Sequence, residues 1–89
     1  MHMEIFAPIY DFLRNLVLKT REETGIPISL LCSSSAVSSR TYAKLVKKIT
    51  VKPECYVRLV IGMCRVCSPE EFMNFWQKLG ERIYEEYGV

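Results

Sequence analysis

The residue types with the most capacity for chemistry in this sequence are its four cysteines, at positions 32, 55, 64 and 67. Cys64 and Cys67 form the sequence CRVC, a spacing used by metal ligands and by redox pairs. A zinc site normally needs four ligands, and the only histidine, His2, stands in an N-terminal tail that we expect to be frayed. A redox pair belongs near a strand–helix junction, and no segment is predicted to be a strand. We therefore interpret the cysteines as core thiols, with a thiol-based metal or redox sensor as the alternative.

No other combination of residues suggests catalysis. The sequence has one histidine, no glycine-rich phosphate loop, and carboxylates that gather at the ends of expected helices. We therefore expect no enzyme activity, no metal, no cofactor and no small-molecule substrate. The apolar runs are too short to span a membrane, and the N-terminus MHMEIFAP lacks the basic region of a secretory signal, so a cytoplasmic protein is expected.

Positive charge is concentrated in one stretch of the chain. No acid occurs between Thr24 and Pro53, and the segment 40–65 contains seven basic residues and one acid, a net charge of +6. The remainder carries five basic and nine acidic residues, a net charge of −4, so the formal total of +2 hides a strong asymmetry. Such a field suits the phosphate backbone of a nucleic acid. The alternatives are an ordinary solvated helix face or another acidic partner.

The residues that would carry this function must be positioned by helices, because nearly all periodic signals in the chain have helical spacing. A first helix is predicted near residues 8–23, with Gly25 as its stop signal. A short second helix is predicted to begin at Pro27 and to bury Leu30, Leu31 and Cys32. Ser38 is expected to cap a third helix over about 38–48. The inward stripe of this third helix is predicted to be Tyr42, Leu45, Val46 and Ile49.

Two further helices are expected. Pro53 begins the fourth, whose inward stripe is predicted to be Val57, Val60, Ile61 and Cys64. The sequence CSPEEF indicates a fifth over about 69–87, with Ser68 and Glu71 as a capping box. Its core-facing residues are predicted to be Phe72, Phe75, Trp76 and Leu79. The chain is therefore expected to form one all-α domain of five helices over residues 1–89, with an extended C-terminal helix.

A short helix, a turn of three or four residues and a basic third helix form a helix-turn-helix arrangement, here over about 26–48. The landmarks, in chain order, are Leu31, Cys32, Ala36, Val37, Ser38, Tyr42, Leu45, KPE at 52–54 and VCSPEEF at 66–72. With these landmarks, residues 9–75 resemble the Cro and phage-repressor type of helix-turn-helix regulator. The resemblance implies a lambda-repressor-like fold of five helices and a transcriptional regulator that binds double-stranded DNA sequence-specifically.

The sequence departs from this family at three places in the motif. Pro27 and Ile28 stand where the family has a serine and a glutamine that clamps a backbone phosphate, so that contact is expected to be absent. Ala36 replaces the turn glycine and is expected to relax or shift a backbone position where positive φ is usually wanted. Val46 stands where an acid commonly ends the recognition helix. The alternative function is a protein–protein interaction module, an adaptor or antirepressor-like protein with little DNA binding.

The resemblance also implies roles for the third helix, which would lie in the major groove as the recognition helix. Arg40 is the first candidate for direct readout, because a guanidinium can bond to guanine O6 and N7 together. Base contacts are expected from Ser39, Arg40 and Lys44. Phosphate contacts are expected from Ser38, Thr41, Lys47, Lys48 and Lys52.

The last helix carries more apolar and aromatic residues than the core of so small a domain needs. Beyond Gly80, we expect Ile83, Tyr84 and Tyr87 to overhang the core and to form the interface of a symmetric homodimer. Such a dimer would present two recognition helices about 34 Å apart, close to one turn of DNA.

Overall fold

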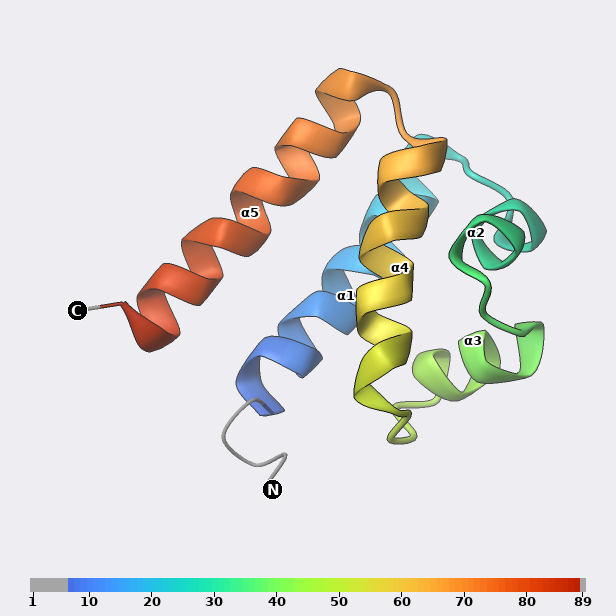
Figure 1. The fold of residues 1–89 in the computed structure, drawn as a ribbon, viewed down its shortest axis with the longest axis horizontal. Coiled ribbons are helices and arrows are strands. Elements are labelled where there is room, and N and C mark those ends of the chain that lie inside the picture. Colours follow the sequence, from blue (N-terminus) through green and yellow to red (C-terminus); the bar gives the residue numbers. More distant parts are fainter. Residues whose placement is uncertain (1–6, 89) are drawn as a thin grey trace.

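Five helices follow one another along the chain (Figure 1). The computed structural model describes residues 7–88, with helices α1 (Ala7–Thr24), α2 (Ile28–Ser35), α3 (Ser39–Val46), α4 (Pro53–Val66) and α5 (Pro69–Tyr87). No strand occurs among these residues, so the expected all-α fold of five helices is confirmed. No helix in the described range is long and apolar enough to cross a membrane. His2 lies outside the described residues.

The ends of the helices follow from local sequence. α1 ends where Gly25 takes a left-handed backbone conformation, with a φ of 74°. Pro53 and Pro69 are the first residues of α4 and α5, where the missing N–H costs nothing. The predicted capping box is present: Ser68 Oγ accepts the Glu71 N–H at 3.2 Å, and Glu71 Oε1 accepts the Ser68 N–H at 2.9 Å. Each of these residues lies within a few positions of the helix end that it determines.

The helices form two packed pairs. α4 packs most extensively against α2, and α5 against α1, while α1 also contacts α4 and so joins the pairs (Figure 1). α3 packs against α2 at one edge of the molecule. α4 and α5 are connected at residues 67–68 and diverge from there, so their far ends are widely separated. The described chain measures 36 × 29 × 17 Å.

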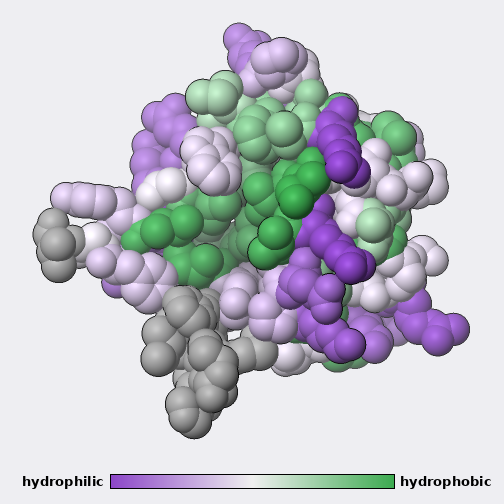
Figure 2. All heavy atoms as spheres, in the orientation of Figure 1, coloured by the Kyte–Doolittle hydropathy of each residue, from purple (hydrophilic) through white to green (hydrophobic). Residues whose placement is uncertain are grey.

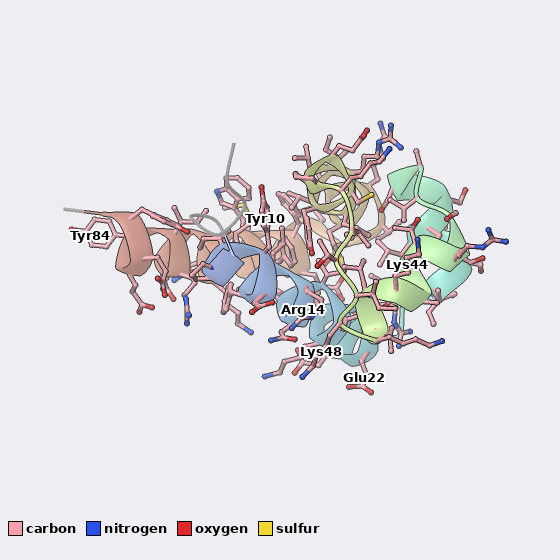
Figure 3. All side chains as sticks on the ribbon, turned by 90° about the horizontal axis from the view of Figure 1, so that it is seen from below. Tyr10, Arg14, Glu22, Lys44, Lys48 and Tyr84 are labelled. Carbon is pink, nitrogen blue, oxygen red and sulfur yellow. The ribbon has the colours of Figure 1, made fainter. Side chains whose placement is uncertain are left out.

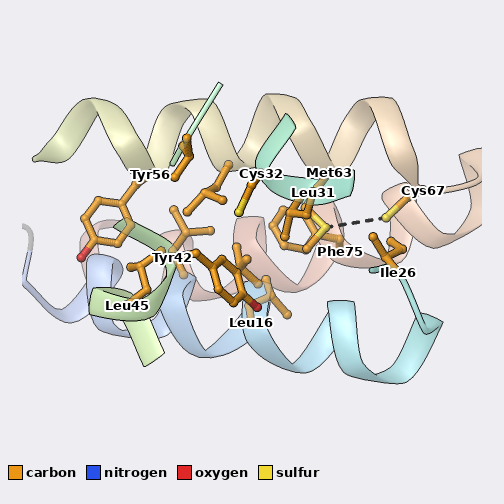
Figure 4. Close-up of a cluster of buried hydrophobic side chains, with 14 of the residues drawn as sticks. Leu16, Ile26, Leu31, Cys32, Tyr42, Leu45, Tyr56, Met63, Cys67 and Phe75 are labelled. Atoms are coloured by element: carbon orange, nitrogen blue, oxygen red, sulfur yellow. Dashed lines mark hydrogen bonds between the residues drawn. The ribbon is translucent and has the colours of Figure 1, made fainter. Parts of the chain in front are cut away.

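The core draws on all five helices (Figure 4). Its largest fully buried side chains are Val17, Leu31, Leu45, Leu59, Met63 and Phe75. Tyr42 and Tyr56 are buried with them, and Tyr56 stacks on Tyr10 of α1 with ring centroids 4.7 Å apart. The Cys67 thiol lies 3.8 Å from the Met63 sulfur. Only two side chains of α3, Tyr42 and Leu45, are buried, so this helix is anchored by one short stripe.

The predicted inward stripe of α4 is wrong. Val57, Ile61 and Cys64 are exposed and Val60 is half-buried. The buried residues of α4 are Tyr56, Leu59, Gly62 and Met63. Both sets recur at three- and four-residue steps, and they lie about 100° apart around the helix. Burying the larger tyrosine, leucine and methionine side chains removes more apolar surface from water, and this packing selects their face.

Four other side chains predicted to lie in the core are about half exposed: they are Leu30, Val46, Ile49 and Trp76. Val46 and Trp76 each follow a fully buried residue, and neighbouring helical residues point about 100° apart. Leu30 likewise precedes the buried Leu31. The predicted core residues Leu31, Cys32, Tyr42, Leu45, Phe75 and Leu79 are buried, and Phe72 is half-buried.

The interpretation of the cysteines as core thiols holds for two of them. Cys32 and Cys67 are buried, and burial raises the pKa of both thiols above the ordinary value of 9.0. Cys55 is half-buried. Cys64 is exposed, so the core interpretation is wrong for this residue, because it belongs to the outward stripe of α4. Within residues 7–88, no group of three or more His, Cys, Asp or Glu side chains could hold a metal ion.

Candidate nucleic-acid interface

A turn over residues 36–38 connects α2 to α3. Ala36 has a φ of 55° and a ψ of 41°, a left-handed conformation. The Val37 N–H donates to the Cys32 carbonyl at 3.0 Å, and the Ala36 N–H donates to the Ser33 carbonyl at 3.3 Å. This pair of bonds is a common way to end a helix, and the buried Val37 and Cys32 side chains complete it. The expectation that Ala36 would relax or shift this position is therefore wrong, since the alanine itself adopts the positive φ.

Ser38 caps the start of α3, as predicted. Its Oγ accepts the Thr41 N–H at 3.1 Å, and its hydroxyl donates to Thr41 Oγ1 at 3.0 Å. The two hydroxyl groups expected to contact phosphate are therefore bonded to each other. Because Ser38 supplies the proton of that bond, the Thr41 hydroxyl proton remains available to an acceptor such as a phosphate oxygen.

α3 ends at Val46, two residues before the predicted end. The Ile49 N–H donates to the Lys44 carbonyl at 2.8 Å, and the Lys48 N–H donates to the Leu45 carbonyl at 3.1 Å. Lys48 has a φ of 63°, so this turn repeats the geometry at the end of α2. The reversal takes Ile49 out of the helix, which explains why its side chain is exposed.

Basic side chains cover the outer face of α3 and the segment after it. Arg40 and Lys44 lie one turn apart, on the side of α3 opposite the buried Tyr42 and Leu45. Both side chains are exposed. The exposed cations of the predicted interface are Arg40, Lys44, Lys47, Lys48 and Lys52. None of the five forms an ion pair with another residue in the range 7–88, so their charge is not neutralised there.

The acids of the molecule lie on other elements. The ion pairs among the described residues join Arg14 to Asp11 at 2.8 Å, Lys19 to Glu23 at 4.0 Å, Arg58 to Glu54 at 3.2 Å and Arg82 to Glu86 at 3.1 Å. These pairs belong to α1, α4 and α5. α3 itself contains no acid, so the potential over its outer face is positive.

Two arginines of α4 fix the end of α2. Arg58 Nη1 donates to the Ala36 carbonyl at 3.1 Å, and Arg65 Nη1 donates to the Ser34 carbonyl at 3.0 Å. These carbonyls lie at the helix terminus, where no intrahelical donor remains. The turn that leads into α3 is therefore held from α4.

Sequence reasoning missed this role, because it counted Arg58 and Arg65 only as positive charges. Between them, Gly62 packs directly against the buried Ser35: a Cβ at Gly62 would fall onto Ser35 Oγ and lie 2.8 Å from its Cβ. The signal that could have revealed the contact is the spacing of Arg58, Gly62 and Arg65. At four- and three-residue steps they share one helix face, on which a glycine between two donors indicates a close neighbour.

Arg21 of α1 interacts with Tyr42, one of the two buried residues of α3. Its Nη1 donates to the Ile26 carbonyl at 3.0 Å. Burial raises the pKa of Tyr42 above its ordinary value of 10.0, and the hydrogen bond and charge of Arg21 partly oppose this effect. The buried phenol of α3 is thus neutral at physiological pH and lies beside a cation of α1.

The first turn of α2 has apolar side chains at its surface. Pro27 occupies the capping position, with no side-chain hydrogen bond to the helix. Ile28 is 42% exposed and Leu30 47% exposed. The side chains of Pro27 and Ile28 offer no amide or hydroxyl group at the place where a phosphate clamp would stand.

The residues predicted for a dimer interface lie far from α3. Ile83, Tyr84 and Tyr87, in the last turns of α5, are exposed. Figure 3 shows Tyr84 at one end of the molecule and Lys44 at the other. The structure therefore separates the basic face and the end of α5 along the longest dimension, 36 Å.

In comparisons with protein-family models, with curated proteins and with solved structures, no match to this chain is found. The candidate site is therefore interpreted from its residues and their geometry.

Proposed function

We propose that this protein is a sequence-specific DNA-binding transcriptional regulator with a lambda-repressor-like fold, in which α3 enters the major groove. The observation that carries the proposal is the outer face of α3. Arg40 and Lys44 stand there one turn apart, opposite the two buried anchors of the helix and without an acid in the same helix. Arg40 lies in the first turn, the part of a recognition helix that reaches base edges.

The contacts divide into those that read sequence and those that provide affinity. Ser39, Arg40 and Lys44 face the bases, and Arg40 is suited to guanine through two parallel hydrogen bonds. The phosphate contacts come from Ser38, Thr41, Lys47, Lys48 and Lys52, on both sides of this face. Because Arg58 and Arg65 bond to the end of α2, they act through the position of α3 and not through DNA.

The test is binding to duplex DNA over a salt series, followed by fluorescence anisotropy. The affinity of the wild type should fall steeply with salt, since each phosphate contact releases about one counterion. The double variant Arg40→Ala with Lys44→Ala should bind at least about tenfold more weakly, because both side chains face the groove. The matched control is Lys19→Ala with Lys78→Ala, which removes the same charge from α1 and α5, away from α3. No binding at low salt, or equal losses in both double variants, would contradict the proposal.

A protein–protein interaction module is the second candidate. It is favoured by the exposed apolar residues near the same surface, which are Ile28, Leu30, Val46 and Ile49. An apolar surface of this kind fits another protein better than it fits phosphate. A wild type that fails to bind duplex DNA at low salt would favour this function over the first.

A further inference from the structure

A second surface of the molecule, on α4 and α5, has no role in the proposed DNA binding. α4 exposes Val57 and Ile61, at 60% and 47%, and α5 exposes Met73 and Trp76, at 59% and 50%. Figure 2 shows apolar side chains gathered on this side of the molecule, over both helices. We call this surface the α4–α5 face; it comprises Val57, Ile61, Cys64, Met73, Trp76, Gly80, Ile83 and Tyr84.

The spacing along α5 is that of a helix-pairing seam. Exposed residues recur at steps of three and four from Met73 through Trp76, Gly80 and Ile83 to Tyr87. This repeat places side chains in line along one side of a helix, as in pairs of helices that pack lengthwise. A Cβ at Gly80 would meet nothing within 4 Å, so the middle of the seam is open to the close approach of another helix.

The charges around this face complement those at the end of α5. Residues 81–87 contain Glu81, Glu85 and Glu86, whereas their one cation, Arg82, is paired with Glu86 at 3.1 Å. On α4, the apolar stripe is bordered by the exposed Arg58 and Arg65, within four residues of Ile61. Arg58 is paired with Glu54 at 3.2 Å, so the charge on this border that no acid of residues 7–88 neutralises is that of Arg65. Figure 2 shows strongly hydrophilic side chains along a border of the apolar region. The acidic, aromatic end of α5 from a second copy therefore fits α4 in both hydrophobicity and charge.

We propose that two copies of this chain pair by laying the C-terminal half of each α5 across the α4–α5 face of the other. The two α5 helices run antiparallel and cross near Gly80. Ile83 and Tyr84 of each copy then pack on Val57 and Ile61 of the other. The interface is isologous, so each contact occurs twice.

An alternative arrangement joins only the ends of the two α5 helices. Tyr84 and Lys44 lie at opposite ends of the molecule, so end-to-end pairing would put the two α3 helices at the far ends of an elongated particle (Figure 3). When α5 of one copy lies across α4 of the other, the two molecules lie partly side by side. The distance between their α3 helices is then closer to the spacing of about 34 Å between half-sites on DNA. This comparison with the half-site spacing is the one part of the proposal that rests on the proposed DNA-binding function.

The oligomeric state without DNA tests the pairing, by sedimentation equilibrium over a range of protein concentrations. The wild type should be a dimer, and Ile61→Asp and Tyr84→Asp should each raise the dissociation constant by at least about tenfold, because each places a charge in a desolvated contact. The matched control Val46→Asp changes an apolar residue of similar exposure beside α3, and should leave the dissociation constant unchanged. Circular dichroism checks that each variant is folded, and Val57→Asp replaces Ile61→Asp if the latter is not.

Mixing the two variants separates this arrangement from end-to-end pairing. In the mixture, the intact α5 of Ile61→Asp can dock on the intact α4 of Tyr84→Asp, so one of the two half-interfaces is restored and heterodimers should form. Monomeric wild type, an unchanged dissociation constant in Ile61→Asp, or a mixture that stays monomeric would each overturn the proposal. Because no DNA is present, these outcomes are independent of whether the protein binds DNA.

Discussion

Lys48 and Ala36 hold left-handed backbone conformations on either side of α3, at positions where glycine would adopt the same φ without strain. For a residue with a Cβ, this conformation costs about 1–2 kcal/mol. Ala36 is held by the bond from Arg58 to its carbonyl and by the packing of α2 on α4. The side chain of Lys48 is exposed, and what it adds at this position is a positive charge beside Lys47. A strained lysine next to a predicted phosphate-binding face is consistent with a gain in function at a cost in stability.

Replacing these two residues by glycine should separate stability from DNA binding. Lys48→Gly and Ala36→Gly should each raise the free energy of unfolding by about 0.5–1 kcal/mol, because the left-handed strain exceeds the entropy that glycine adds to the unfolded chain. Lys48→Gly alone should also weaken binding to DNA and reduce the salt dependence by about one counterion. Urea unfolding and the anisotropy titration measure the two effects. Equal losses of affinity in both variants would show that the turn, and not the charge of Lys48, matters.

At the scale of the elements, the position of α3 depends on how α2 is seated on α4. Gly62 lets the two helices approach until a Cβ at this position would lie 3.0 Å from the Ser35 Cα. Arg58 and Arg65, on either side, bond to the last carbonyls of α2. Since only two side chains of α3 are buried, a shift of α2 would move α3 with it.

Two glycines of the chain offer a matched test of this contact. Gly62→Ala should lower the free energy of unfolding by about 1–3 kcal/mol, because the added methyl group overpacks the α2–α4 contact and backbone must move. A Cβ at Gly80 meets no atom of its own chain within 4 Å, so at protein concentrations at which the chain is monomeric Gly80→Ala should raise it by about 0.5–1 kcal/mol, since alanine is the better helix former. Thermal and urea unfolding measure both changes. A Gly62→Ala variant as stable as Gly80→Ala would rule out the tight contact between α2 and α4.

At the scale of the whole molecule, charge and burial are divided between regions. The basic residues of α3 and its flanks are exposed and have no acid among them, and the acids of residues 7–88 lie on α1, α4 and α5. The core between them contains titratable groups that are kept neutral. Burial raises the pKa of the Cys32 and Cys67 thiols above 9.0 and that of the Tyr42 and Tyr56 phenols above 10.0.

These raised pKa values predict how stability depends on pH. The folded protein keeps protons that the unfolded chain releases, so the stabilisation is fully present below about pH 9 and is lost as pH rises through the folded-state pKa values. The free energy of unfolding should be nearly flat from pH 7 to about 8.5 and should fall above pH 9. Tyr42→Phe should make the fall above pH 10 shallower, because one buried phenol no longer ionises. Urea unfolding at each pH measures this, with Tyr84→Phe as the matched control; identical curves for Tyr42→Phe and wild type would contradict the prediction.

The sequence by itself predicted the five helices and most of their ends, but not the end of α3, which falls at Val46 and not near residue 48. The stop at Gly25, the caps at Ser38 and Ser68 and the prolines at 53 and 69 act on backbone groups within four residues, so no distant contact is needed to interpret them. It also determined which segment carries the unpaired cations, because local composition sets local charge. Periodicity also predicted that Tyr42 and Leu45 are buried, although Val46 and Ile49 of the same predicted stripe are exposed.

Tertiary structure alone decided which face of α4 is buried. Val57, Ile61 and Cys64 and the buried set around Leu59 have the same helical period, so periodicity cannot choose between them. The buried face is selected by the larger side chains of Tyr56, Leu59 and Met63 and by Gly62, which lets α2 approach closely. Both effects depend on α2, whose Ser35 lies 27 residues before Gly62 in the chain. The same packing assigned Arg58 and Arg65 to the end of α2 and left an apolar stripe of α4 at the surface. Long-range packing thus determined the α4–α5 face, and local signals determined the basic helix.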